Sequence, residues 1–355
     1  MSDRAQTDLP TCADSSDDRP FCEAPFRKLL VAGDKQAYLC CWAPQAIGDL
    51  TQQTSEEAWN SSRAQDFRAS IHDGTFRYCD RGLCPWLQAD RLPRRSEVAD
   101  PYLAGLIASG ATEISAGFSE LLLGYDRSCN LACPSCRPGL HSAGGDELDQ
   151  ILAVHENVVG DRLQNLHGLE KLFVSVDGDA FTSRVYRDLL FEMKAADFPE
   201  LRIRIMTNGL LFTPRMWERL AGIRDCIKEV VISIDAATPE TYEIVRKGGS
   251  FAVVLENLRF LGKLYRDGRL AGLSITFVVQ RVNYREMRPF AELGASIPCG
   301  VTFIKMMNPG HIPLGEFVHD PAHPEHADLL ETLKDPILRT SSVNVDAFAD
   351  LLAVR

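Results

Sequence analysis

The chain has 355 residues, 45% of them apolar and 25% charged, and its 49 acidic and 38 basic residues give a formal net charge of −11. These values are typical of a globular protein and exclude a wholly disordered chain. The excess of acid argues against a nucleic-acid partner, because phosphate affinity comes from clustered lysine and arginine. No stretch approaches the roughly 18 apolar residues of a membrane span, and the acidic first twenty residues lack the apolar run of a signal peptide. We therefore expect a cytoplasmic protein without a membrane partner.

Residues 1–20 are predicted to form a disordered acidic tail. Residues 21–95 hold five of the eleven cysteines, two strand-like runs at Lys28–Val31 and Gln36–Cys40, and a helical run at Thr54–Ser70. A polar, proline-containing stretch begins at Arg91, and residues 96–118 are predicted to be a linker. Without an export signal, the clustered cysteines favour metal or cluster ligation over disulfides.

Short β-rich runs alternate with helical runs over residues 119–310, before a C-terminal tail at 311–355. Parallel strands need helical crossovers, so this alternation predicts an α/β fold with a parallel sheet. The spacing allows a doubly wound sheet or a partial barrel, and both place ligands at the carboxyl ends of the strands. Thr213 and Thr238 each precede a proline and are predicted N-caps. The predicted strands are Glu120–Tyr125, Leu172–Val176, Ile203–Thr207, Glu229–Ile234, Leu273–Val279 and Val301–Lys305. The predicted helices include Glu147–Val158, Pro214–Leu220, Phe251–Tyr265 and Arg285–Leu293.

The strongest chemical signal is Cys129-Asn-Leu-Ala-Cys133-Pro-Ser-Cys136, directly after the first of these strands. Three thiolates at the spacing CxxxCxxC can hold three irons of a [4Fe–4S] cube and leave the fourth iron without a protein ligand. A zinc site normally has a fourth cysteine or histidine, and His141 keeps that alternative open.

This motif and the strand pattern resemble the radical S-adenosylmethionine (radical SAM) superfamily over residues 119–308. The resemblance implies a partial (β/α)6 barrel, a [4Fe–4S] cluster held by Cys129, Cys133 and Cys136, and S-adenosylmethionine bound at the open iron. It also implies cleavage of the cofactor to a 5′-deoxyadenosyl radical, which abstracts hydrogen from a substrate. Ser135 departs from the pattern, because members commonly have an aromatic residue before the last cysteine.

Polar strand ends further along the chain resemble the cofactor-binding motifs of that family. Asp179 stands at the acidic position of the family's Gly-Gly-Glu motif, which receives the cofactor's amino group. Arg246 resembles the arginine that pairs with the cofactor's carboxylate. Ser233 and Asp235 alternate onto one face of a strand, where they could bond ribose hydroxyls; strand-end caps and solvated acids are the structural alternatives. The expected cofactor-binding residues are Asp177, Gly178, Asp179, Asn208, Ser233, Asp235, Arg246 and Gln280.

The N-terminal cysteines form a second group. The opening Cys22-x-x-Pro-Phe, the hairpin ending in Cys40-Cys41 and the Glu56-x-x-Trp59-Asn60 helix resemble SPASM and twitch auxiliary iron–sulfur domains over residues 21–88. The domain precedes the barrel here, whereas in the family it usually follows. The resemblance implies a second, auxiliary [4Fe–4S] cluster, with Cys41 as an alternative to Cys40 and zinc as an alternative to iron. The implied ligands are Cys22, Cys40, Cys79 and Cys84.

The resemblance therefore predicts a radical SAM oxidoreductase whose cofactor supplies the difficult chemistry. We expect a small polar substrate, such as a sugar or aminocyclitol, in a redox or epimerisation step. A ribosomal-peptide maturase and a non-catalytic iron–sulfur or zinc sensing module are the alternatives. An electron donor such as flavodoxin or ferredoxin is the expected protein partner, and no catalytic acid, base or hydrogen donor is assigned. The histidines at 311, 319, 323 and 326 are interpreted as part of a structural or substrate-capping tail, because Pro321 and Pro324 interrupt any regular helix.

Overall fold

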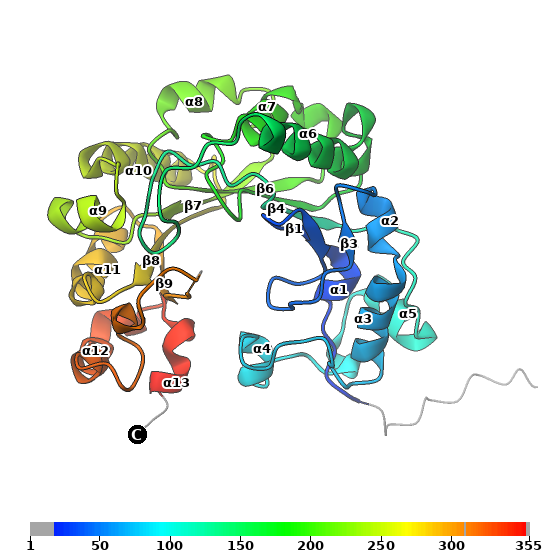
Figure 1. Ribbon diagram of the computed structural model, residues 1–355, viewed down its shortest axis with the longest axis horizontal. Helices are drawn as coiled ribbons and strands as arrows, with labels where there is room; N and C mark the ends of the chain where they lie inside the picture. Colours follow the sequence, from blue (N-terminus) through cyan, green and yellow to red (C-terminus); the bar gives the residue numbers. More distant parts are fainter. Residues whose placement is uncertain (1–17, 309, 353–355) are drawn as a thin grey trace, which may run out of the picture.

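The computed structural model describes residues 18–308 and 310–352, so Cys12 and most of the predicted acidic tail lie outside the described residues. One sheet runs through both halves of the chain, with the strand order β10-β9-β8-β7-β6-β5-β4-β1-β2-β3. It curls into an open ring with the large helices on its outer side (Figure 1). The strands are β1 (Lys28–Val31), β2 (Gln36–Tyr38), β3 (Gly48–Asp49), β4 (Glu120–Leu123), β5 (Lys171–Val174), β6 (Arg202–Thr207), β7 (Ile227–Ser233), β8 (Gly272–Val279), β9 (Gly300–Lys305) and β10 (Val343–Asn344).

Strands β4 to β9 are parallel neighbours in chain order, and each connection between consecutive strands contains at least one α-helix. This arrangement confirms the expected α/β fold with a partial six-stranded barrel. The side chains of Thr213 and Thr238 accept hydrogen bonds from Met216 N–H and Thr241 N–H, which confirms both predicted N-caps. The barrel helices are α6 (Asp146–Val159), α7 (Arg184–Glu192), α8 (Pro214–Arg219), α9 (Pro239–Val245), α10 (Phe251–Arg266) and α11 (Met287–Ser296).

The cysteine-rich part of the chain is built onto the barrel's first strand. Its β1 pairs in parallel with β4 along four residues and antiparallel with β2. The helical run predicted for Thr54–Ser70 is two helices, because Ser61 accepts the Ala64 N–H as an N-cap and starts a new one. The helices of this part are α1 (Ala24–Arg27), α2 (Ser55–Trp59), α3 (Ser62–His72), α4 (Pro85–Gln88) and α5 (Pro101–Ser109), the last inside the predicted linker.

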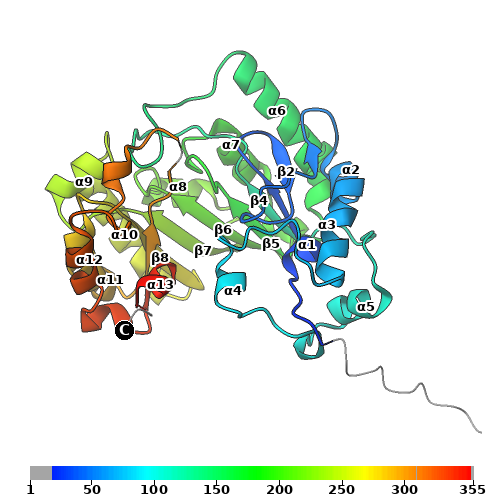
Figure 2. The same ribbon diagram turned by 60° about the horizontal axis from the view of Figure 1, so that its bottom comes forward.

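The C-terminal segment returns to the far edge of the sheet, where β10 pairs in parallel with β9. Its helices are α12 (His326–Thr332) and α13 (Ala349–Leu352), and they lie across an opening from α4 (Figure 1). Turning the molecule shows the parallel strands β5 to β8 between the N-terminal helices and the C-terminal helices (Figure 2). One hydrophobic core, whose members range from Phe21 to Phe348, joins the cysteine-rich part at residues 21–95, here called the N-terminal module, to the barrel. No helix in the described ranges is long and apolar enough to cross a membrane.

Candidate functional site

The three cysteines of the CxxxCxxC motif lie in the loop after β4, at the carboxyl edge of the sheet. The loop is fixed by its own backbone. The Cys129 N–H donates to the His141 carbonyl at 2.8 Å, and the N–H groups of Cys136 and Arg137 both donate to the Cys133 carbonyl, at 2.9 and 3.0 Å. Cys133 is buried, whereas the other two cysteines are half-buried. The sequence therefore places three sulfurs on one tight loop at the edge where parallel sheets bind ligands.

Each of these sulfurs has a side-chain N–H donor, and each donor comes from a different part of the chain. Burial raises the pKa of the Cys129 and Cys133 thiols, and metal ligation would overcome this because it deprotonates the thiol. N–H groups directed at sulfur stabilise the negative charge that cluster thiolates carry, so the residues present fit a cluster. The pairs are Asn208 Nδ2 with Cys129 Sγ at 3.7 Å, Arg246 Nη1 with Cys133 Sγ at 3.8 Å, and Arg137 Nη2 with Cys136 Sγ at 3.5 Å.

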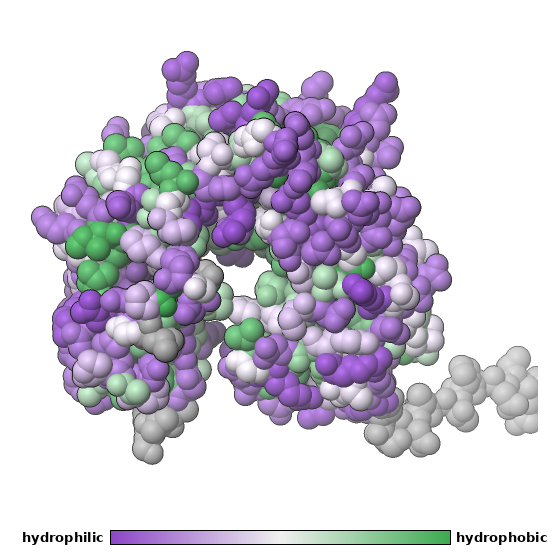
Figure 3. All heavy atoms as spheres, viewed as in Figure 1, coloured by the Kyte–Doolittle hydropathy of each residue, from purple (hydrophilic) through white to green (hydrophobic). Residues whose placement is uncertain are grey.

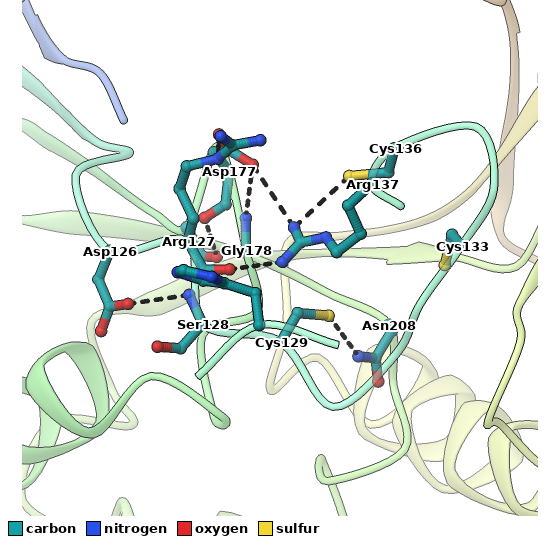
Figure 4. Close-up of polar contacts among 12 residues, drawn as sticks. Asp126, Arg127, Ser128, Cys129, Cys133, Cys136, Arg137, Asp177, Gly178 and Asn208 are labelled. Atoms are coloured by element: carbon teal, nitrogen blue, oxygen red, sulfur yellow. Dashed lines mark hydrogen bonds and ion pairs between the residues drawn. The ribbon is translucent and has the colours of Figure 1, made fainter. Parts of the chain in front are cut away.

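The predicted cofactor-binding residue Asp177 lies beside this loop in an ion-pair network (Figure 4). Its carboxylate is 2.8 Å from Arg127 Nε and 3.7 Å from Arg137 Nη2. The next residue, Gly178, has a φ of 82°, and a side chain there would come within 2.7 Å of the Asp126 carbonyl oxygen. Only glycine satisfies both conditions. The Asp-Gly pair therefore lets the end of β5 pack closely against the cysteine loop.

Asp179 is fully buried, and both of its carboxylate oxygens already have donors. Oδ1 accepts from the N–H groups of Phe181 and Thr182, at 3.1 and 3.0 Å. Oδ2 accepts from the Thr207 hydroxyl at 2.7 Å and the Asn208 N–H at 2.9 Å. The Asp179 carboxylate thus links the segments that follow β5 and β6. Asn208, in the segment after β6, is also the donor to the Cys129 sulfur.

Asp235 and Arg246 are brought together as a buried pair, with Oδ2 and Nη2 2.6 Å apart. Burial raises the pKa of Asp235, and the guanidinium opposes that rise. Asp235 lies beyond β7 with a φ of 61°, so the alternation expected to give it the same face as Ser233 has already ended. Ser233 instead accepts a hydrogen bond from the Thr276 hydroxyl at 3.1 Å.

A cavity of about 870 Å³ opens beside the cysteine loop at the carboxyl ends of the strands. Among the eight expected cofactor-binding residues, Gln280 lines it. Leu140, Ile244 and Val282, which are 72%, 55% and 43% exposed, also line it. Figure 3 shows an opening between the N-terminal module and the C-terminal segment, in the middle of the molecule. Further lining residues include Asn130, Ser135, Arg137, Lys247, Arg281, His311 and Glu316.

The four expected ligands of the auxiliary cluster converge in the N-terminal module. Cys22, Cys40, Cys79 and Cys84 all line one small cavity, and Cys41 does not. Cys41 is exposed and, together with Cys22, Cys40 and Cys84, lines a neighbouring cavity of about 480 Å³. The pKa of the Cys22 thiol is raised to about 12, mainly by burial. The backbone N–H of Ala24 opposes this rise, and the three other thiols add to it. Of the two neighbouring cysteines, Cys40 is thus the one that shares the small cavity with the other three candidate ligands.

Other metal arrangements have less support in the geometry. No three histidine, cysteine or carboxylate side chains of residues 18–308 and 310–352 meet closely enough to hold a single metal ion. A cube holds its ligand sulfurs farther apart than one ion does, so this criterion does not apply to a cluster. The His141 ring lies 3.2 Å from Glu147. Three tail histidines contact backbone carbonyls, those of Pro134, Gly315 and Val318.

Sequence reasoning missed two polar residues of this region. Arg137 contacts a cysteine sulfur, and the signal was its position directly after the last cysteine. Asn130 accepts from Asn208 Nδ2 at 2.7 Å and from the Thr182 hydroxyl at 2.9 Å. It lies inside the motif, but its partners are 78 and 52 residues away, and nothing in the local sequence indicates them.

Curated relatives match parts of this chain. The mycofactocin maturase MftC of Mycobacterium ulcerans is 31% identical over 169 residues, which cover 47% of this chain and 41% of that protein. A GTP 3′,8-cyclase of Alkaliphilus metalliredigens is 27% identical over 193 residues, covering 53% of this chain and 54% of that protein. The chain thus spans about half the length, or less, of these relatives.

Solved structures and family models also match. Streptococcus suis SuiB superposes with a TM-score of 0.45 at 15% identity, covering 82% of this chain and 64% of that chain. SuiB bound to precursor peptide SuiA gives a TM-score of 0.39 at 14% identity, covering 74% and 58%. The family model described as the radical SAM superfamily matches residues 126–294, and the SPASM model, described as an iron–sulfur cluster-binding domain, matches residues 22–85. The chain therefore carries a radical SAM domain and, before it, a SPASM-type iron–sulfur domain.

Proposed function

We propose that this radical SAM enzyme modifies a peptide, which reverses the order of the substrate classes expected from the sequence. The observation that carries the proposal is the cavity beside the cysteine loop, together with the opening between the N-terminal module and the C-terminal segment (Figure 3). An extended peptide needs a site that is open to solvent on more than one side, whereas a small polar substrate is normally enclosed. A maturase among the curated relatives supports the same substrate class.

The mouth of the cavity has the chemistry of a peptide anchor. Leu140, Ile244 and Val282 are apolar and exposed at the mouth, and such groups recognise an apolar or aromatic side chain on binding. Lys247 and Arg281 line the same cavity and add positive charge. These residues would bind an apolar side chain next to an acidic or carboxyl group of the peptide.

The barrel cysteines would hold a [4Fe–4S] cluster that, with bound S-adenosylmethionine, supplies one-electron cleavage and a carbon-centred radical. The protein's own residues hold and orient these groups. Asn208, Arg137 and Arg246 place N–H groups on the sulfurs. Arg246 and Gln280 are the proposed contacts for the cofactor's carboxylate and its adenine.

The reaction class is tested with anaerobically reconstituted protein, dithionite and S-adenosylmethionine. The wild type should release 5′-deoxyadenosine, and the triple variant Cys129→Ala, Cys133→Ala, Cys136→Ala should not. No release from the wild type with any reductant would leave the chain as a non-catalytic iron–sulfur module.

The substrate class is tested by co-expression with the short peptides encoded beside the gene, followed by mass spectrometry. A peptide mass change that is absent with the triple variant supports the proposal. Leu140→Ser and Ile244→Ser should reduce that change at least tenfold while 5′-deoxyadenosine release persists. A second candidate is a nucleotide substrate, favoured by the matches to GTP 3′,8-cyclases. Consumption of GTP, with every peptide left unmodified, would favour it.

A further inference from the structure

Arg137 is held in one orientation by three different partners. Its side chain is 7% exposed. Nη1 donates to the Arg127 carbonyl at 2.6 Å, and Nη2 lies 3.5 Å from Cys136 Sγ and 3.7 Å from Asp177 Oδ1 (Figure 4). A guanidinium carries its N–H donors in one fixed plane. The contacts with the Arg127 carbonyl and the Asp177 carboxylate therefore fix the orientation of the N–H group that faces Cys136.

The partners of Arg137 are in turn packed against the N-terminal module. Arg127 Nε pairs with Asp177 Oδ2 at 2.8 Å. Gly33, in the turn between β1 and β2, faces this pair. A β-carbon at Gly33 would lie 2.6 Å from Arg127 Cδ and 3.2 Å from Asp177 Oδ2. The β1–β2 hairpin of the N-terminal module thus contacts the Arg127–Asp177 ion pair, which orients Arg137 toward Cys136.

We propose that Arg137 is a positioning residue for the barrel cluster, and that the Gly33 turn holds it in place through Asp177 and Arg127. The N-terminal module then helps to set the reduction potential of a cluster that it does not ligate. This inference concerns the cluster alone and holds for any substrate.

The sign of the effect follows from charge. Reduction adds an electron to the cluster, and both a positive charge and an N–H donor at a ligand sulfur favour the reduced form. Arg137 therefore raises the reduction potential of the barrel cluster. Arg137→Met removes the charge and the donor at similar length, whereas Arg137→Lys keeps the charge and loses the fork.

The measurement is a redox titration of the reconstituted full chain, followed by electron paramagnetic resonance without S-adenosylmethionine. The barrel signal is the one that disappears in the triple variant of Cys129, Cys133 and Cys136. Arg137→Met should lower the ratio of reduced to oxidised cluster at fixed potential by about tenfold, which is about 59 mV for one electron. Arg137→Lys should recover part of this shift.

The role of the turn is tested by a double-variant cycle. In the wild-type background, Gly33→Ala should lower the ratio of reduced to oxidised barrel cluster at fixed potential. In the Arg137→Met background it should have no further effect, because both changes act through the contact of Arg137 with Cys136. Gly105→Ala is the matched control, since a β-carbon there meets nothing within 4 Å.

Two results would overturn the inference. One is an unchanged potential in Arg137→Met with its iron retained. The other is an equal effect of Gly33→Ala in both backgrounds. If Arg137→Met fails to take up iron, the cycle is run with Arg137→Lys against the same criteria, and iron content separates a lost cluster from a shifted potential.

Discussion

At the scale of single residues, Asp179 is the expected cofactor-binding carboxylate that the structure buries completely. Its expected contact with the cofactor's amino group stays a prediction, and in the structure its oxygens accept hydrogen bonds from backbone N–H groups and a hydroxyl at the ends of β5 and β6. Asp179→Asn replaces one acceptor oxygen by an NH₂ group that faces those donors. We expect the free energy of unfolding to fall by about 2–4 kcal/mol, measured by urea denaturation under anaerobic conditions.

The matched control for this change is Asp188→Asn, on the exposed side of α7, where the carboxylate is 57% exposed and little change is expected. A direct cofactor contact gives a different pattern. In that case the affinity for S-adenosylmethionine would fall by one to two decades while the urea midpoint stayed at the wild-type value, and our reading of Asp179 would be wrong.

His155 predicts a pH dependence. Its Nδ1 lies 2.7 Å from the hydroxyl of buried Tyr125, and burial lowers the pKa of the ring from 6.5 to about 4. Below pH 6.5 the unfolded chain binds the proton more readily, so stability falls as the pH drops from about 6.5 to 4. The loss is at most about 3 kcal/mol, and less because the ring is only half-buried.

His155→Gln should flatten this part of the stability curve, because glutamine can accept from Tyr125 without titrating. The measurement is the difference in unfolding free energy between wild type and variant at pH 7 and pH 5. The same slope in both proteins would show that His155 does not titrate in this window.

Residue-scale prediction from the sequence is strongest where spacing carries the chemistry. Cys129, Cys133 and Cys136 can be named as candidate ligands without knowledge of the fold, because they lie close together in the chain. Which carboxylates are free and which are buried could not be predicted in this way. Asp177 and Asp179 are two residues apart in one motif. Asp177 is 33% exposed and pairs with Arg127 and Arg137, whereas Asp179 is fully buried, since β5 ends where Ser175 adopts a φ of 66°.

At the scale of secondary-structure elements, Arg68 connects the N-terminal helices. It is fully buried in α3, and its guanidinium donates to the carbonyls of Pro25, Trp59 and Thr112, each at 2.8 Å. Burial lowers its pKa to about 10. Arg68→Met removes the donor from two buried carbonyls and one half-buried carbonyl, and we expect the free energy of unfolding to fall by about 3 kcal/mol. Hydrogen exchange should accelerate in α1 to α3 before it does in the barrel.

The control is Arg63→Met, an exposed arginine of the same helix, which should exchange like the wild type. Equal protection of α1 to α3 in the Arg68 and Arg63 variants would show that the apolar core alone holds these helices together.

Strand and helix prediction worked well in the barrel, because buried parallel strands read as short apolar runs between helical patterns. It was weaker in the N-terminal module. The break between α2 and α3 depends on Ser61, whose hydroxyl accepts from the Ala64 N–H and also donates to the Ile47 carbonyl at 2.8 Å. The second contact comes from a residue 14 positions earlier, so local sequence gives no reason to prefer Ser61 to its neighbours.

At the scale of the whole molecule, the pairing of β1 with β4 decides how the two cysteine sites are related. The sequence indicated two modules but not their junction, because any apolar strand could have covered the edge of β4. The parallel register of Lys28 to Val31 with Glu120 to Leu123 makes one sheet of both. The turn after β1 thereby reaches the barrel's cysteine loop, while Cys22 and Cys40 lie near the other ends of β1 and β2.

This layout predicts two separate clusters, which iron analysis can count. The four N-terminal cysteines are far from the barrel loop in sequence and line their own cavity, so each site should fill without the other. Reconstituted wild type should hold about eight irons per chain, two cubes of four. The triple variant of Cys129, Cys133 and Cys136 should hold about four, and so should Cys22→Ala combined with Cys79→Ala.

Cys226→Ala and Cys299→Ala alter buried cysteines outside both sites and should keep all eight. If the wild type instead holds about four irons and one zinc, and the triple variant loses all the iron while keeping the zinc, the N-terminal site is a structural zinc site and the auxiliary cluster is ruled out.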